Sequence, residues 1–310
     1  MIDIPRRQIP PLAIAGFTAV VSGVAVFVNA YGVHAVRTAS VYTTAKNLVA
    51  AVVLAAGAAI WASRRRRRGP ASLPAPPVSP PAARLLGLVY VAVVGGGIAF
   101  VLFFDGLAAT TATPAAFIKD SMVVWVAIMA RPLLGERMTT WNVAAVTLLF
   151  AGQVTALGGT GHLALSAGTT AVAAATVLWA LEVVVAKRLL VTVSPTTLAV
   201  VRMGGGSAVL VSYLAVTGQL GALAGLGAGQ WAWAAGTGGL LSLYVASWFT
   251  ALSRARAVDV TSVLVASALV TAACQAAAGS ADVVTQTLGL TLVAAGTALV
   301  FAPRLHRAPA

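Results

Sequence analysis

The sequence predicts an all-α polytopic membrane protein, and its composition and hydropathy support that prediction. Hydrophobic residues make up 59% of the 310 residues and charged residues only 9%, whereas soluble domains average about 25% charged residues. The mean hydropathy is +0.94. Because backbone polar groups find no water in lipid, the apolar runs must be helical, and they lack the alternation of a membrane β-barrel. We therefore expect a single membrane domain over residues 1–310.

Ten apolar runs are long enough to cross a bilayer, which takes about 20 residues. They lie near residues 11–30, 39–62, 84–107, 113–131, 139–158, 167–186, 195–217, 230–252, 258–279 and 284–302. The runs divide into two five-helix halves, 11–158 and 167–302, and a cytoplasmic tail follows at 303–310. A linker rich in arginine and proline, 64–83, separates the second run from the third. Because five is odd, the second half enters the membrane from the opposite side.

The basic residues predict the orientation of the spans. With the N-terminus in the cytoplasm, sixteen of the 20 lysines and arginines fall on the cytoplasmic side, as the positive-inside rule requires. Arg37 falls in an outer loop, and Lys46, Lys119 and Arg202 fall inside spans. We expect a multi-pass protein of the cytoplasmic (plasma) membrane with both termini in the cytoplasm.

Two internal matches support the division into halves. The string Thr38-Ala-Ser-Val-Tyr-Thr-Thr-Ala-Lys46 resembles Ser194-Pro-Thr-Thr-Leu-Ala-Val-Val-Arg202 at an offset of 156, and each opens a span and ends on a base. Leu134-Gly135-Glu136 corresponds to Ser280-Ala281-Asp282 at an offset of 146, where each ends a fourth span with an acid. With the odd span count, the matches predict an inverted repeat, which many secondary transporters use for alternating access.

A family resemblance follows from these motifs. Leu134-Gly135-Glu136, then Trp141, then Leu148-Leu-Phe-Ala-Gly152, together with the paired halves, resemble the EamA type of the drug/metabolite transporter (DMT) superfamily. Its members commonly carry a basic residue in the second span of each half, which Lys46 and Arg202 match. The second half departs from the pattern because it lacks Leu-Gly-Glu. The resemblance implies a ten-helix carrier for small organic solutes, often an exporter, with a central cavity between the halves.

Charged residues inside spans are costly and usually face the bundle interior in pairs. The candidates are Lys46, Asp105, Lys119, Asp120, Glu182 and Arg202. Glu182 and Arg202 each lie about ten residues from the turn near 191–192, at equal depth on a helix hairpin. We therefore predict an ion pair or a shared polar site between them. The same reasoning places Asp105 and Lys119 level with each other around residue 111.

Two interpretations of these charges stay open. The bases Lys46, Lys119 and Arg202 would orient an anionic or zwitterionic solute, and the acids Asp105, Asp120 and Glu182 would balance them or carry protons. Alternatively, the charges are structural pairs that touch no solute. Neighbouring residues on a helix project about 100° apart, so we expect only one of Lys119 and Asp120 to face the cavity.

Polar and aromatic residues near these charges complete the predicted pathway. We assign Tyr42, Asn47, Trp125 and Trp179 to it, with ordinary packing as the alternative for each. The glycine runs at 95–97 and 204–206 predict close helix packing. Glu136 is interpreted as an acid that complements the dipole at the N-terminus of the fifth span.

The sequence lacks the motifs of several other function classes. It has no phosphate-binding loop, nucleophile elbow or metal-ligand spacing, so we expect no enzyme, no metal and no cofactor. Its net charge of +13 follows topology rather than a nucleic-acid-binding face. The expected partners are a small-molecule solute and the lipid bilayer, and the oligomeric state, monomer or homodimer, stays open. The alternative functions are a non-transporting membrane sensor or accessory subunit and a membrane-embedded lipid-modifying enzyme.

Overall fold

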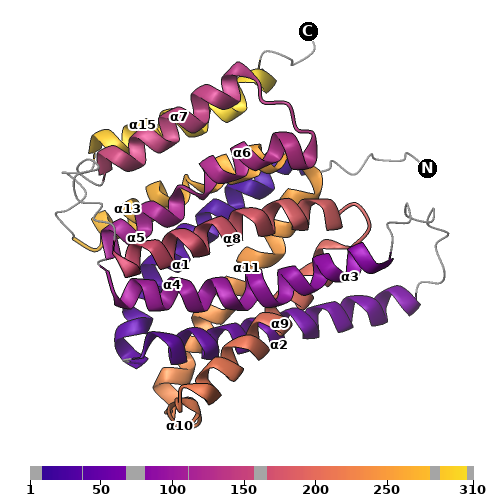
Figure 1. Ribbon diagram of the computed structural model, residues 1–310, viewed down its shortest axis with the longest axis vertical. Helices are drawn as coiled ribbons and strands as arrows, with labels where there is room; N and C mark the ends of the chain where they lie inside the picture. Colours follow the sequence, from indigo (N-terminus) through magenta and orange to yellow (C-terminus); the bar gives the residue numbers. More distant parts are fainter. Residues whose placement is uncertain are drawn as a thin grey trace, which may run out of the picture.

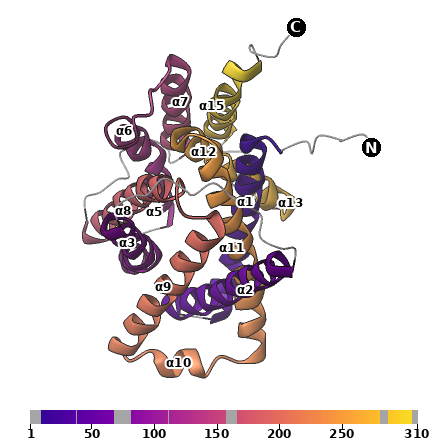
Figure 2. The same ribbon diagram turned by 90° about the vertical axis from the view of Figure 1, so that its right-hand side faces the viewer.

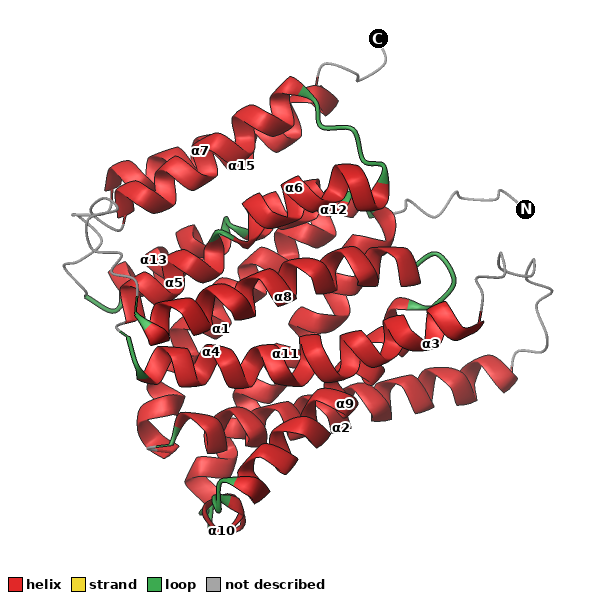
Figure 3. Ribbon diagram, in the orientation of Figure 1, coloured by secondary structure: helices red, strands yellow, loops and turns green. Residues whose placement is uncertain are grey.

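The computed structural model describes residues 9–36, 38–67, 81–110, 112–156, 166–279 and 287–305. The described part of each predicted apolar run is helical, with interruptions in the fourth and ninth runs. The described residues form helices and connecting loops without a strand (Figure 3). Among them, six helices are long and apolar enough to cross a membrane. The all-helical fold is therefore confirmed, while the count of ten spans and the orientation of the termini stay predictions.

In the first half, the third predicted run contains a π-helical segment and the fourth is interrupted. Its elements are α1 (Pro11–Val36), α2 (Ala39–Arg67), α3 (Pro81–Val89), η1 (Tyr90–Ile98), α4 (Ala99–Ala108), α5 (Ala112–Asp120), α6 (Met122–Leu134) and α7 (Thr140–Ala156). Because α2 continues to Arg67, the start of the predicted linker is helical, and residues 68–80 lie outside the described residues. The third run contains the π-helix η1, and the fourth is interrupted at Ser121.

The second half repeats this organisation. Its elements are α8 (Ala167–Leu189), α9 (Pro195–Val216), α10 (Leu220–Ala224), α11 (Ala228–Arg254), α12 (Ala257–Leu264), α13 (Ser267–Ala277) and α15 (Thr287–Leu305). The ninth run is interrupted between α12 and α13, as the fourth is between α5 and α6. Figure 2 shows the short α10 joining the ends of α9 and α11. Ser280 and Asp282, the predicted counterparts in the second half, lie outside the described residues.

The helix contacts follow the predicted correspondence between halves. Helix α1 contacts α11 as its counterpart α8 contacts α4, and α2 contacts α11 as α9 contacts η1. The two closing helices, α7 and α15, lie side by side (Figures 1 and 2). The main core draws on both halves and includes Leu12, Val126, Ala180, Leu198, Phe249 and Val263. The two-repeat architecture is thus visible in the packing as well as in the sequence.

The close crossing of η1 and α9 depends on glycine. A β-carbon on Gly96 of η1 would overlap the carbonyl oxygen of Arg202 in α9, and one on Gly206 would overlap the backbone of Gly96. The expected close packing of the two glycine runs is confirmed at this crossing. It places the backbone of η1 directly against the part of α9 that carries Arg202.

Candidate functional site

A cavity of about 240 Å³ lies between the two halves and gathers most of the predicted intramembrane charges. The first half contributes the side chains of Lys46, Lys119 and Asp120, and the second contributes Glu182 and Arg202. Apolar and aromatic side chains of α1, α4, α8 and α11 form much of the remaining wall. A largely apolar cavity with a few convergent polar groups is the usual form of a small-molecule site.

Glu182 and Arg202 form a buried, two-contact ion pair, as predicted from their equal distance to the α8–α9 turn. Arg202 Nε lies 2.5 Å from Glu182 Oε1, and Arg202 Nη2 lies 3.1 Å from Oε2. The exposed fractions of the two side chains are 12% for Arg202 and 6% for Glu182. A planar guanidinium matches a carboxylate in this parallel geometry, so the charge of Arg202 is largely satisfied within the protein.

The π-helix η1 supplies a third partner to this pair. The carbonyl oxygen of Gly95 accepts hydrogen bonds from Trp179 Nε1 at 3.0 Å and from Arg202 Nη2 at 3.4 Å. A β-carbon on Gly95 would overlap the Glu182 carboxylate, so only glycine leaves room for the pair. The sequence predicts a helix here but not its π-helical geometry, which is frequent at functional sites.

Lys46 differs from Arg202, because its ammonium has no acidic partner among the described residues. Lys46 Nζ donates a hydrogen bond to Asn29 Oδ1 at 3.1 Å and lies 5.3 Å from the centre of the Tyr42 ring. Within the described residues, no carboxylate oxygen lies within 4.0 Å of this nitrogen. Among the described residues that line the cavity, Lys46 is therefore a base without a balancing carboxylate.

Lys119 and Asp120 both line the cavity, so the expectation that only one of them would face it is wrong. Lys119 Nζ lies 3.4 Å from Asp120 Oδ1. Helix α5 ends at Asp120, and Ser121 Oγ donates to the carbonyl oxygen of Ile118 at the interruption. Both residues belong to α5, so their Cα–Cβ bonds project about 100° apart, and the long side chain of Lys119 brings its ammonium to the neighbouring carboxylate.

Four other predicted pathway residues lie away from the cavity wall. Tyr42 and Asn47 are completely buried between helices, whereas Trp125 is 40% exposed on α6. Asp105 Oδ1 accepts a hydrogen bond from the hydroxyl of Tyr213 at 2.8 Å, which links α4 to α9. Their predicted contact with solute finds no counterpart in the residues that line the cavity.

Aromatic side chains form two parts of the wall. Trp179 lines the cavity as predicted, and its ring packs against Phe100 and Phe103 with centroid distances of 5.2 and 5.4 Å. Tyr244 and Trp248 of α11 also line it and stack at 6.2 Å. These faces suit the apolar part of an organic solute.

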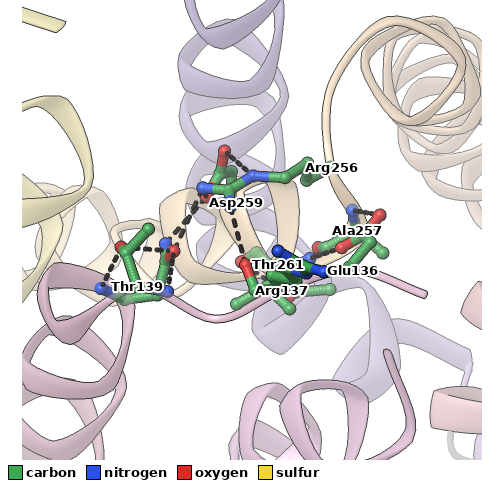
Figure 4. Close-up of polar contacts among 9 residues, drawn as sticks. Glu136, Arg137, Thr139, Arg256, Ala257, Asp259 and Thr261 are labelled. Carbon is green, nitrogen blue, oxygen red and sulfur yellow. Dashed lines mark hydrogen bonds and ion pairs between the residues drawn. The ribbon is translucent and has the colours of Figure 1, made fainter. Parts of the chain in front are cut away.

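A polar cluster joins the two halves where α6 ends and α12 begins (Figure 4). Glu136 Oε1 accepts a hydrogen bond from the backbone N–H of Ala257 at 2.9 Å, and Oε2 accepts one from Val258 at 3.4 Å. The expectation that Glu136 serves the fifth span is wrong. Thr139 and Asn142 cap that helix reciprocally, with Asn142 N–H donating to Thr139 Oγ1, and Glu136 is free to cap α12 of the other half.

Sequence reasoning missed Asp259, which holds the same cluster together. It is 2% exposed and binds Arg256 through both carboxylate oxygens, at 2.9 and 3.1 Å. Asn142 Nδ2 donates to Asp259 Oδ1 at 2.9 Å, which connects α7 to α12. Its position three residues after a basic residue at a helix start was the available signal. Elsewhere in the described chain, no three His, Cys, Asp or Glu side chains are grouped to hold a metal ion.

Comparison with known proteins agrees with the two-half arrangement. The sequence profile of the EamA-like transporter family matches residues 11–157 and 166–302. The chain belongs to the EamA-like transporter family. The resemblance predicted from the Leu-Gly-Glu motif and the paired halves is therefore confirmed, and this EamA-like protein is a multi-pass membrane transporter of the DMT type.

A solved structure supports the fold of this EamA-like transporter. A crystal structure of a protein with 16% sequence identity covers 95% of this chain and 98% of the solved chain, with a TM-score of 0.70. At that identity the likeness concerns the fold alone. Among curated proteins, none matches the sequence.

Proposed function

We propose that this EamA-like transporter moves a small organic solute with an anionic group, such as an amino acid or an organic acid. The observation that carries the proposal is the charge of the cavity wall. Three bases, Lys46, Lys119 and Arg202, face two acids, Asp120 and Glu182, which leaves one formal positive charge. Because an uncompensated charge away from water is costly, a solute that brings a negative charge would be favoured over a bare cation.

The three bases differ in how much charge they offer a solute. Arg202 is paired through two contacts with Glu182, and Lys119 lies near Asp120. Lys46 faces only neutral partners. We therefore assign the anionic group of the solute to Lys46, a charge-balancing role to Glu182 and a proton-coupling role to Asp120.

Alternating access of the two halves is the proposed mechanism. The interrupted helices α5–α6 and α12–α13 contribute residues on both sides of their breaks to the cavity wall, including Asp120, Val123, Leu264 and Ser267. Discontinuous helices at the interface of two repeats are typical of secondary transporters. The distribution of basic residues supports a location in the cytoplasmic membrane with both termini in the cytoplasm, and we propose export as the direction, because transporters of the EamA type are often exporters.

Solute exchange in proteoliposomes tests this function. Vesicles containing the protein are loaded with a pooled set of amino acids, organic acids, amines and neutral metabolites, and the loss of each is followed by mass spectrometry. We expect anionic or zwitterionic solutes to leave the vesicles selectively. In Lys46→Ala the rate should fall at least about tenfold, because one charged hydrogen bond to the solute is removed. Arg131→Ala removes a base on the exposed surface of α6 and serves as the matched control.

The alternatives predict different results in the same vesicles. A membrane sensor or accessory subunit would bind a solute without moving it. A lipid-modifying enzyme would change the lipid composition of the vesicles. Selective movement of cations alone would contradict the proposed solute class, and equal transport by Lys46→Ala and the wild type would return Lys46 to a structural role.

A further inference from the structure

We propose that Asn29 of α1 determines the charge preference of the cavity by holding the ammonium of Lys46 with a neutral oxygen. This inference rests on the proposed function for its solute class and adds a residue that the sequence did not single out. The key contact is the hydrogen bond from Lys46 Nζ to Asn29 Oδ1 at 3.1 Å, and both side chains line the cavity.

The side-chain amide of Asn29 is held in one orientation. Its Nδ2 donates a hydrogen bond to the carbonyl oxygen of Ala25 at 2.7 Å, within the same helix. The oxygen therefore points toward α2, where an ammonium can donate to it. A rotated amide would bring an N–H donor against the donors of Lys46 and would lose the bond to Ala25.

Two further side chains lie near this amide. Tyr42 was predicted to line the pathway but lies outside the cavity wall, and Thr237, which lines the wall, was not predicted. The hydroxyl of Tyr42 lies 2.9 Å from Asn29 Oδ1 and 2.9 Å from Thr237 Oγ1. The Tyr42 hydroxyl has one proton, so it donates to either Asn29 Oδ1 or Thr237 Oγ1 at a time, and Thr237 donates its own proton to the carbonyl oxygen of Trp233. A β-carbon on Gly32 would overlap the Tyr42 hydroxyl. Polar side chains of α1, α2 and α11 thus gather beside the contact between Asn29 and Lys46.

The counterpart of this site in the second half shows what the neutral oxygen changes. At the repeat offset of 156, Lys46 corresponds to Arg202 and Val26 corresponds to Glu182. Arg202 therefore receives a carboxylate from α8, whereas α1 offers Lys46 only the amide of Asn29, about one turn from Val26. One base of the pair is neutralised by the protein, and the other keeps its charge.

The donors of Lys46 specify the chemistry of the group that would bind. An ammonium has three N–H donors, and Asn29 uses one. The other two N–H donors have no acceptor among the described residues. A carboxylate, sulfonate or phosphate oxygen of the solute would accept hydrogen bonds from them. Asn29 acts as a positioning residue for Lys46.

The near-isosteric variant Asn29→Asp tests the inference. It places a carboxylate against Lys46 that competes with the anionic group of the solute. Binding is measured on the purified full-length protein in detergent, as the shift in melting temperature with short-chain carboxylates and with the corresponding amides and amines. We expect Asn29→Asp to bind carboxylates about 10- to 100-fold more weakly, as for the loss of a charge-assisted hydrogen bond, with amide binding unchanged.

Three further variants separate a local effect from a general one. Lys46→Met should show the same loss, and adding Asn29→Asp to it should cause no further loss, because both changes remove one interaction. Ser22→Asp puts a carboxylate on the same cavity face of α1 about 10 Å away and should weaken carboxylate binding less. Asn29→Ser keeps a neutral oxygen and should retain the preference for carboxylates. It therefore shows whether substitution at position 29 by itself, rather than the new carboxylate, weakens binding.

The outcomes distinguish a failure of this inference from a failure of the proposed solute class or of transport. Unchanged carboxylate affinity in Asn29→Asp, with loss in Lys46→Met, would overturn the role of Asn29 and leave the solute class intact. A wild-type protein that binds carboxylates no better than amides, or binds neither, would overturn the inference. Binding with the expected preference but without exchange in proteoliposomes would support Asn29 and contradict transport.

Discussion

The carboxylate of Glu136 in the first half accepts a hydrogen bond from the backbone N–H of Ala257, the first residue of α12 in the second half, at 2.9 Å. A helix N-terminus carries unpaired N–H donors and a partial positive charge, both of which a carboxylate satisfies. A short loop after α6 is therefore the N-terminal cap of a helix from the other repeat. This contact fixes α12 against the first half at the end of the bundle where Asp259 is buried.

Glu136→Ala should destabilise the transporter by about 1–2 kcal/mol, the usual cost of losing a helix cap. The reason is that the N–H groups of Ala257 and Val258 lose their acceptor. Glu136→Gln keeps an oxygen acceptor and should cost less. Unfolding of the purified protein in a titrated denaturing detergent gives the comparison, and equal stability of all three proteins would contradict the capping role.

The buried pair of Glu182 and Arg202 makes a prediction about partner removal. Arg202→Met leaves the Glu182 carboxylate without its charged partner, and truncating one member of a buried pair typically costs about 3–5 kcal/mol. The double variant Glu182→Gln/Arg202→Met removes both charges and should recover much of that loss. The same unfolding titration measures the coupling, and additive losses in the double variant would show that the pair contributes nothing jointly.

The glycines at the crossing of η1 and α9 provide a matched pair of variants. Gly96→Ala would bring a methyl group into the backbone of Arg202, whereas Gly204→Ala meets no atom within 4 Å. We expect Gly96→Ala to lower the melting temperature and to impair transport, because the backbone cannot move away. Gly204→Ala should be neutral or stabilise α9 by up to about 1 kcal/mol through helix propensity. Similar melting temperatures for the two variants would contradict close packing at this crossing.

The sequence predicted those contacts that follow from regular helix geometry. Glu182 and Arg202 could be paired because α8 and α9 form a hairpin with a short turn, so distance along the chain gives depth. The convergence of Lys119 with Asp120 could not be predicted, because the direction of a Cα–Cβ bond does not show where a long, flexible lysine side chain places its ammonium. The role of Asn29 also stayed hidden, since one amide in an apolar run does not reveal which neighbouring helix it faces.

The partner of Glu136 was mispredicted for a related reason. Local rules favour a cap on the next helix in the chain, but Thr139 and Asn142 already cap α7. Only the packing of α6 against α12 brings the carboxylate to the second half. Contacts between repeats require the tertiary arrangement, which the span pattern constrains but does not specify.

Asp120 and Asp105 allow a final test of the proposed proton coupling. The side chain of Asp120 is 28% exposed, lines the cavity and has a single ion-pair contact, with Lys119 at 3.4 Å. Asp105 lies outside the cavity wall and is held by Tyr213. We expect Asp120→Asn to exchange solute down its own gradient but to lose acceleration by an imposed pH gradient, because an amide side chain does not ionise and so cannot carry a proton. Asp105→Asn should respond to the gradient as the wild type does. Exchange in proteoliposomes with and without the pH gradient measures both variants, and a pH response that survives in Asp120→Asn, or that the wild type lacks, would contradict the assignment of Asp120.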